Sequence, residues 1–233
     1  MAKYWQAGSA KTRLAPLLGF EHAALVQKYL VEAVVARWKS VADERAICFA
    51  PATARDQFAT LVASLAPAAW QLTEQSPGDL GERLISCTSA AFHAGCQRLL
   101  LIGSDSPDLP RDYIDEAFAQ LATHDIVLGP SEDGGYYLVG LSQPATTIFQ
   151  SIAWSTPQVL QQTLARIAAA GLSVHLLPAW YDCDEPSDLE RLMQQLARRS
   201  VADPDRAEPD LVALERKLRE LREQANSQAM QQQ

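Results

Sequence analysis

The sequence has few cysteines and histidines, and their scarcity excludes several metal and redox sites. Its four cysteines are scattered, without the paired Cys-x-x-Cys spacing of a structural zinc site. The four histidines are equally dispersed, and no two of them stand at metal-ligand spacing. Isolated thiols of this kind are typical of reduced cysteines in a cytoplasmic protein, so we expect no disulfide framework.

Long apolar runs and an excess of basic residues are also missing. No segment approaches the roughly 20 apolar residues that cross a bilayer, and residues 1–4 lack the hydrophobic core of a secretion signal. The 20 lysines and arginines are outnumbered by 28 acids, which gives a net charge of -8. Nucleic-acid affinity comes mainly from clustered basic side chains. We therefore expect a cytoplasmic protein with no membrane span and no nucleic-acid partner.

Short apolar segments alternate with longer segments of helical periodicity over residues 1–200, which we treat as one domain. This alternation predicts an α/β fold of the Rossmann-like, three-layer type with a mostly parallel sheet. The expected strands are 46–50, 70–73, 98–102, 125–128, 136–141 and 174–177. The expected helices are 21–38, 53–65, 80–94, 110–121, 157–170 and 186–198. Segment 136–141 follows the preceding strand too closely for a helical crossover, so we expect it to join the sheet antiparallel.

From about Val201 the sequence becomes charged and rich in glutamine, and residues 201–233 are expected to form a separate tail. Leucines at positions 211, 214, 218 and 221 predict a short amphipathic helix. Two heptads are few for an independent coiled coil, so this would be a surface helix or a weak homodimer contact. Residues 226–233 are expected to be disordered.

The strongest functional candidate is Asp105, which directly follows the apolar segment 99–102. Ligands of open α/β sheets bind beyond the carboxyl ends of the strands, where Gly103 permits close backbone approach and Pro107 stiffens the turn. Asp105 is therefore a candidate to hold Mg²⁺ or Mn²⁺ between diphosphate oxygens. The alternative is an acid that only begins a turn.

A second acid, Asp133, precedes the glycine pair Gly134 and Gly135 just past another expected strand. Paired glycines let a ligand lie against bare backbone. Asp133 would then contact a sugar hydroxyl or a metal-bound water, or act as a catalytic base. The alternative is an Asp-Gly turn that leads into an antiparallel strand.

The N-terminal segment 3–14 is a loop of small residues that also carries Lys11 and Arg13. Backbone N–H groups of such a loop can bind phosphates while the two cations neutralise charge. The spacing of a Walker A loop is absent. The alternative is an ordinary basic surface loop.

Two aspartates alternate in segment 180–189, just before an expected helix. Alternation places the carboxylates of Asp182 and Asp184 on one side of an extended chain, which suits a second metal contact, above all at Asp184. The alternative is that such acids complement the positive end of the helix.

Two weaker candidates have ready structural explanations. Gly81 is a candidate to line a nucleobase site, although the surrounding Asp79 and Glu82 form a capping-box pattern that explains the segment as a helix start. Trp154 is a candidate to stack on a sugar or base, with a core tryptophan as the alternative.

Taken in order, these motifs resemble those of a bacterial GT-A-like family, the glycosyltransferases of arsenosugar biosynthesis. More distantly, they resemble the guanylyltransferases that activate 2-phospholactate. The matching segments are Ala2–Tyr4, Lys11–Ala15, Leu80–Arg83, Ile102–Pro107, Asp133–Tyr137, Trp154–Thr156 and Asp182–Leu189.

The resemblance implies a nucleotide-diphospho-sugar transferase fold. It places Asp105 at the position of the metal-binding acid of the D-x-D type, with Lys11 and Arg13 near the phosphates. Members of this family usually begin with an apolar strand before the Ala-Lys-Tyr segment, where this sequence has only Met1. We therefore expect the first strand to be a stub or missing.

Three functions are compatible with these residues. The first is a metal-dependent glycosyltransferase that takes a nucleotide-diphospho-sugar and a small-molecule acceptor, with Asp133 as base. The second is a nucleotidyltransferase that joins a nucleoside triphosphate to a phosphorylated small molecule and releases pyrophosphate. The third is a non-catalytic sugar-nucleotide binding protein.

Overall fold

The computed structural model describes residues 1–66, 68–202 and 208–231 of an α/β protein. Its strands form a three-stranded sheet of order β1-β2-β3 and a four-stranded sheet of order β4-β6-β5-β7. The chain divides into two compact units. We call residues 2–73, 104–108 and 183–233 the terminal unit, and Met1, 74–103 and 109–182 the central unit.

The terminal unit is built on β1 (Ala2–Lys3), β2 (Ala46–Ala50) and β3 (Gln71–Glu74). β1 runs parallel to β2 and places Ala2 opposite Phe49. Its first helices are α1 (Ala15–Leu18), α2 (Phe20–Arg37) and α3 (Arg55–Leu65), with 3-10 helices at Thr12–Leu14 and Ala52–Ala54. Val31 and Val35 of α2 share a core with Phe49 and Phe58, because the apolar face of α2 covers this sheet.

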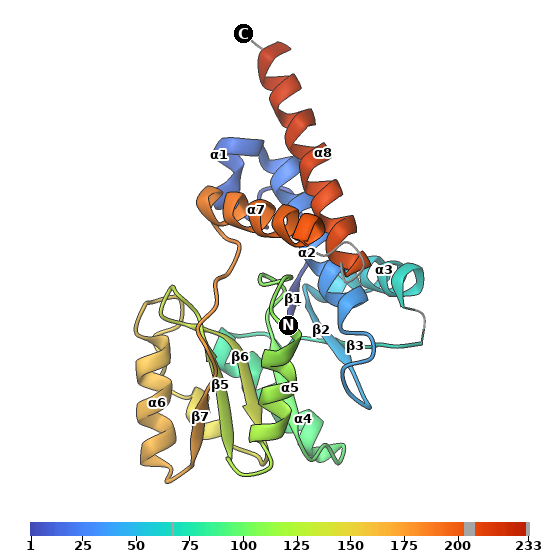
Figure 1. Cartoon of the computed structure of the whole chain (residues 1–233). Helices are drawn as coiled ribbons and strands as arrows, with labels where there is room; N and C mark the ends of the chain where they lie inside the picture. The colour runs from blue at the N-terminus through green and yellow to red at the C-terminus, as the bar shows by residue number, and fades with distance from the viewer. Residues whose placement is uncertain (67, 203–207, 232–233) are drawn as a thin grey trace. The chain divides into compact units, whose positions relative to one another are not determined.

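Two further helices, α7 (Pro186–Ala202) and α8 (Pro209–Gln231), complete the terminal unit. α8 packs against α2 and α7 (Figure 1). The predicted leucine stripe is confirmed, and its four leucines at 211, 214, 218 and 221 are buried within the chain. These leucines are therefore core residues of this unit and are not exposed for contact with a second copy of the chain.

The expected disorder of residues 226–233 is wrong for 226–231, because α8 continues through them. Glutamine, alanine and methionine are good helix formers and can extend a helix that packing has already nucleated. The last two residues, 232–233, lie outside the described part of the chain.

The central unit contains β4 (Leu99–Ile102), β5 (Ile126–Pro130), β6 (Tyr136–Leu141) and β7 (Val174–Leu176). β6 lies between β4 and β5 and is antiparallel to both, which confirms the predicted insertion. β7 is parallel to β5. The sheet of this unit is therefore mixed: β4, β5 and β7 run in one direction, and β6 is the antiparallel insertion between β4 and β5.

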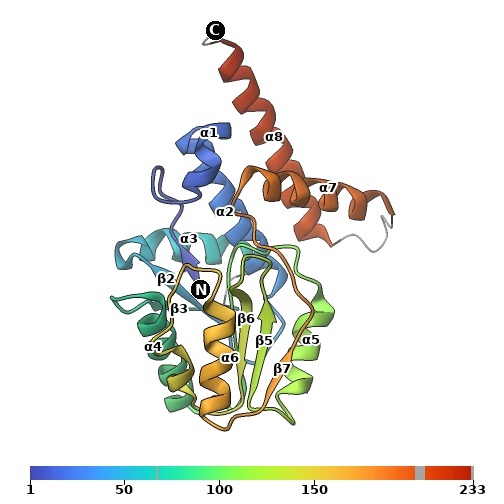
Figure 2. The same cartoon turned by 90° about the vertical axis from the view of Figure 1, so that its left-hand side faces the viewer.

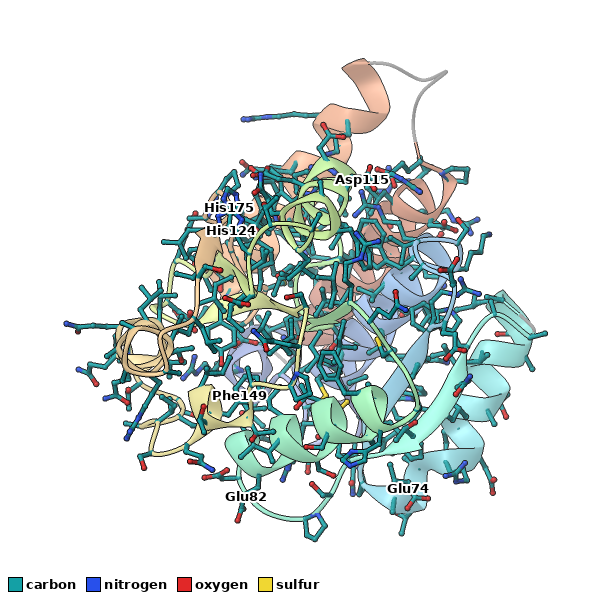
Figure 3. All side chains as sticks on the ribbon, turned by 90° about the horizontal axis from the view of Figure 1, so that it is seen from below. Glu74, Glu82, Asp115, His124, Phe149 and His175 are labelled. Carbon is teal, nitrogen blue, oxygen red and sulfur yellow. The ribbon has the colours of Figure 1, made fainter. Side chains whose placement is uncertain are left out.

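Three helices of this unit, α4 (Leu80–His93), α5 (Arg111–Gln120) and α6 (Val159–Ala169), accompany the strands, with a 3-10 helix at Thr146–Phe149. Figure 2 shows α6 lying over β5, β6 and β7. Leu84 of α4, Phe149 and Ile167 of α6 share one core with the sheet. α5 lies on the other side of the strands (Figure 3).

Local capping chemistry explains several helix ends. Asp79 and Glu82 form the predicted capping box at the start of α4. Gly171, with φ of 66°, provides a left-handed stop after α6. α6 begins at Val159, two residues after the expected start at Pro157. No helix among residues 1–66, 68–202 and 208–231 has the length and apolarity needed to cross a membrane.

Candidate functional site

A buried lysine joins two aspartates at the centre of the candidate site. The Lys11 side chain is 3% exposed, and its Nζ lies 2.8 Å from Oδ1 of Asp105 and 2.6 Å from Oδ1 of Asp184. The three residues come from separate segments of the terminal unit: the loop before α1, the turn after β4, and the segment before α7. The structure thus brings together three of the residues that the sequence predicted; we call them the Lys11 cluster.

The two carboxylates determine the charge state of Lys11. Burial alone would lower the pKa of Lys11, because a desolvated ammonium favours its neutral form. The charges of Asp105 and Asp184 and the hydrogen bonds to them outweigh this effect and hold the pKa of Lys11 above its ordinary value of 10.5. The ammonium therefore stays protonated at neutral pH.

The backbone at Lys11 is strained. Its φ of 47° and ψ of 41° lie in the left-handed region, which residues with a Cβ rarely adopt. Such a conformation costs on the order of 1–3 kcal/mol and is typical of functional sites. The Leu14 N–H donates to the Lys11 carbonyl over 2.9 Å, which begins the adjoining 3-10 helix. A buried, strained lysine does not fit the alternative of an ordinary basic surface loop.

Arg13, two residues further along, lies in a different environment. Its side chain is 69% exposed, and its Nη1 lies 3.8 Å from Oε1 of Glu185. An ion pair this long and exposed contributes little to stability. Arg13 is therefore available to an incoming anion, whereas Lys11 is engaged within the protein.

Hydrogen bonds hold the segment that carries Asp105, residues 104–108, which we call the acidic turn. Gln27 Nε2 donates to Ser104 Oγ over 3.1 Å, and Arg37 Nη1 donates to the Pro107 carbonyl over 3.0 Å. The Cys183 N–H donates to the Asp105 carbonyl over 2.9 Å. Sequence reasoning missed Gln27 and Arg37, although two polar residues on the buried side of α2 were a usable signal.

The donors of the Lys11 cluster can be tested for their fit to Mg²⁺ or Mn²⁺. Asp105 and Asp184 present two carboxylates whose side chains are 36% and 46% exposed. Mg²⁺ in nucleotide enzymes is commonly held by one or two carboxylates together with phosphate oxygens and water. In the described residues, no three His, Cys, Asp or Glu side chains are grouped to hold a metal. The set therefore fits a cation shared with a diphosphate and not a metal bound by the protein alone.

The two alternating aspartates of segment 180–189 have different partners. Asp182 Oδ2 accepts from Ser131 Oγ over 2.7 Å within the central unit, whereas Asp184 belongs to the Lys11 cluster of the terminal unit. Between them, Cys183 is fully buried, and burial raises the pKa of its thiol well above the usual range. Cys183 is therefore protonated at neutral pH and is not a nucleophile.

In the central unit, Asp133, Gly134 and Gly135 form the turn that leads into β6. Asp133 is exposed, and its Oδ1 accepts from the Gly135 N–H over 2.9 Å. Gly134 has φ of 89°, and a Cβ there would lie 2.3 Å from the carbonyl oxygen of Pro157. Each of the three residues thus has a structural task in an Asp-Gly turn. The role of Asp133 as a base stays a prediction.

Gly81 and Trp154 also have structural tasks in the central unit. Gly81 lies in α4, where a Cβ would lie 2.7 Å from both the Phe149 carbonyl oxygen and the Trp154 Nε1. Trp154 packs against the core of the unit and meets Tyr136 edge-on, with ring centroids 6.4 Å apart. These contacts favour the packing interpretation of both residues.

One pair of histidines from distant segments meets beside β7. His124 and His175 lie side by side (Figure 3), with ring centroids 5.5 Å apart. His175 Nε2 is 2.8 Å from Oε1 of Glu116. These residues do not form a metal-binding group in the described part of the chain.

Comparison with known proteins agrees with this fold. A crystal structure of a "putative nucleotide-diphospho-sugar transferase" from Desulfovibrio desulfuricans G20 is 30% identical, with a TM-score of 0.78 over 96% of this chain and 95% of that one. Rv0371c from Mycobacterium tuberculosis H37Rv is 14% identical over 70% of this chain and 81% of that one, and its TM-score of 0.45 is too low to carry an argument.

No protein with a curated description matches the chain. Residues 33–156 match the model of a family described as an uncharacterized protein conserved in bacteria, DUF2064. That match spans more than half of the sequence. The family match and the 30% identical relative together show that this chain belongs to the DUF2064 family.

Proposed function

We propose that this protein is a transferase that takes a nucleotide-diphospho-sugar as its donor, with Mg²⁺ or Mn²⁺ as cofactor and a small molecule as acceptor. The likeness to the Desulfovibrio protein, at 30% identity over 96% of this chain, supports a donor of this class. The observation that carries the proposal is the strained, buried Lys11 ammonium between two partly exposed carboxylates. Such a cluster costs folding energy and is typical of a site.

Arg13 and the Lys11 cluster would divide the work of donor binding. Arg13 is exposed and is suited to contact a phosphate first. Asp105 and Asp184 would hold the metal ion, which supplies positive charge to the departing diphosphate. Lys11, only 3% exposed, orients both carboxylates and offsets part of their charge.

In sugar transfer, an acceptor hydroxyl forms a bond to the anomeric carbon while the bond from that carbon to the diphosphate breaks. The hydroxyl proton must go to a base, and Asp133 is our candidate because its side chain is exposed on a turn anchored by glycines. Gly134 and Gly135 would contribute through the shape of the turn that presents Asp133. In this scheme, Gly81 acts through the packing of α4.

A thermal-shift panel with UDP-, GDP- and ADP-sugars, GTP and CTP, each with and without Mn²⁺, tests this proposal. We expect one nucleotide with Mn²⁺ to stabilise the protein by about 2.7 kcal/mol at a concentration 100 times its Kd. Asp105→Asn should abolish this shift, whereas Asp115→Asn, an exposed acid of α5 in the central unit, should retain it. If no nucleotide raises the Tm of the unaltered protein, the proposal is wrong.

An assay for pyrophosphate then separates sugar transfer from nucleotidyl transfer. A glycosyltransferase releases a nucleoside diphosphate and no pyrophosphate, whereas a nucleotidyltransferase that uses GTP or CTP releases pyrophosphate. Binding of a nucleotide-sugar without release of either product, over a range of acceptors, would favour a non-catalytic binding protein.

A further inference from the structure

We propose that Arg37 is a positioning residue for Asp105, and that it couples the start of α8 to the acidic turn. The inference rests on the proposed function, in which Asp105 must face a metal-bound diphosphate. It concerns residues of the terminal unit only. Arg37 itself would touch neither substrate nor metal.

Arg37 is a buried charge at the end of α2. Its side chain is 2% exposed, and its guanidinium lies 4.6 Å from the ring centroid of Trp38. Nε and Nη2 donate to Oε2 and Oε1 of Glu208 over 2.5 and 2.7 Å, which makes a bidentate pair. The remaining nitrogen, Nη1, donates to the Pro107 carbonyl over 3.0 Å. One planar group is thus fixed to α8 on one side and to the acidic turn on the other.

The cost of burying this charge indicates a task other than stability. Desolvating a guanidinium costs several kcal/mol, and an apolar side chain of similar volume would often serve a helix interface equally well. The fork of Arg37 adds fixed geometry, because its donors keep their relative directions. What that geometry controls is the backbone of Pro107, two residues after Asp105.

A second contact from α2 brackets the same aspartate. Gln27, also buried, donates to Ser104 over 3.1 Å. Asp105 therefore lies between the two residues of the turn that α2 holds, Ser104 and Pro107. Holding the chain on both sides of Asp105 limits where its carboxylate can point, which is what a shared metal site requires.

The chain offers a matched control on the same two helices. Lys217 of α8 donates to Glu32 of α2 over 2.6 Å, and its ammonium lies 5.2 Å from the ring centroid of Tyr29. Within the described part of the chain, Lys217 pairs with Glu32 and not with the acidic turn. Breaking this pair weakens the packing of α8 on α2 without removing a bond to the turn.

Hydrogen–deuterium exchange without any ligand tests the positioning role. Arg37→Met should speed exchange of the amides of residues 104–106 and 108, and of the Cys183 amide that donates to Asp105, by about 10-fold or more. Lys217→Met, which breaks the other ion pair between α2 and α8, should leave these amides unchanged. Arg37→Lys should behave like Arg37→Met, because a lysine keeps the charge but lacks the fork.

If Arg37→Met does not fold, Glu208→Gln provides the same test with a smaller expected effect, about 3-fold faster exchange of the turn. This change removes the negative partner of the buried Arg37 guanidinium but keeps a side-chain oxygen that can accept one hydrogen bond from it, so the hold on the turn is weakened and not lost. Equal protection of residues 104–108 in the Arg37 or Glu208 variant and in Lys217→Met would overturn the inference.

Binding of Mn²⁺ with the nucleotide found in the panel gives the second readout. We expect Arg37→Met to weaken Mn²⁺ binding by about 10-fold, in the range known for residues that orient metal ligands, and Lys217→Met to leave it unchanged. If the unaltered protein binds no Mn²⁺ and no nucleotide, the proposed function fails, whereas the exchange experiment still decides whether Arg37 holds the turn.

Discussion

Two turns of this protein present an aspartate just after a strand, and their surroundings differ sharply. In the acidic turn, Asp105 pairs with the buried ammonium of Lys11, and α2 holds the Ser104 hydroxyl on one side of it and the Pro107 carbonyl on the other. In the turn before β6, Asp133 is exposed and accepts a hydrogen bond from Gly135, two residues away. The first acid depends on partners from distant parts of the chain, and the second on its own turn.

The difference shows why a similar sequence pattern can carry different chemistry. A carboxylate that caps its own turn is satisfied by local hydrogen bonds. A carboxylate fixed against a buried lysine has a defined position and a neighbouring charge, which are the conditions for binding a metal-bridged phosphate. The acidic turn is therefore the stronger candidate for chemistry.

The largest effect should come from removing both acids of the Lys11 cluster. Asp105→Asn with Asp184→Asn leaves a buried ammonium without a negative partner, which we expect to lower the free energy of unfolding by about 3 kcal/mol. Urea unfolding at pH 7 measures this loss. Adding Lys11→Met should recover at least half of it, because the buried charge is then gone. A loss below about 1 kcal/mol would contradict the burial of Lys11 between these acids.

A glycine should be the sensitive residue of the second turn. Gly134→Ala places a Cβ 2.3 Å from the Pro157 carbonyl oxygen at a φ of 89°, so both a steric clash and backbone strain result. We expect a loss of about 2–3 kcal/mol in the free energy of unfolding. Gly95→Ala is the control, because Gly95 has a similar φ of 92° but nothing within 4 Å of its added Cβ. Equal losses in both variants would mean that strain, and not the contact with Pro157, sets the cost.

Much of the fold could be predicted because its signals are local. All six expected strands and all six expected helices occur, with ends that differ by a few residues. The antiparallel place of β6 followed from a connection too short for a helix. The extension of α8 beyond Asn226 and the place of β6 between β4 and β5 were not predictable, because they depend on packing between segments and not on local pattern.

The candidate site could be predicted only in part. Lys11, Asp105 and Asp184 were each identified from their own segments, but their convergence was not, since Lys11 and Asp184 are 173 positions apart. Arg37 was missed because a helical pattern gives no sign of the carbonyl, 70 positions away, that its side chain will reach. Candidate site residues can be recognised from the sequence around each of them, whereas which of them meet in space depends on the tertiary fold.

The pH dependence of stability can isolate Lys11 from other groups. Its pKa is raised in the fold, so its contribution is complete below 10.5 and is lost as the pH rises above that value, where only the unfolded chain releases the proton. We expect the unaltered protein to lose about 0.8 kcal/mol more than Lys11→Met between pH 9 and 11. Urea titrations at each pH measure the difference.

The stability of the unaltered protein must be compared with that of Lys11→Met, because two tyrosines also contribute to the pH dependence. Burial raises the pKa of Tyr136 and of Tyr137, so both also favour the folded state less at high pH. They are present in both proteins and cancel in the difference. Parallel curves for the two proteins would show that the tyrosines account for the whole pH dependence and that Lys11 is not held as a buried ammonium.

The smallest effect should be that of Asp133→Asn on stability. An asparagine side chain can accept the same hydrogen bond from the Gly135 N–H and suits a turn, so we expect a change within about 0.5 kcal/mol in the free energy of unfolding. The same variant tests the base: if Asp133 takes the acceptor's proton, kcat should fall about 100-fold or more with little change in KM. If both stability and kcat were unchanged, Asp133 would not be the catalytic base and would have only a structural role in its turn. The Lys11 cluster would then be the remaining candidate for the chemistry.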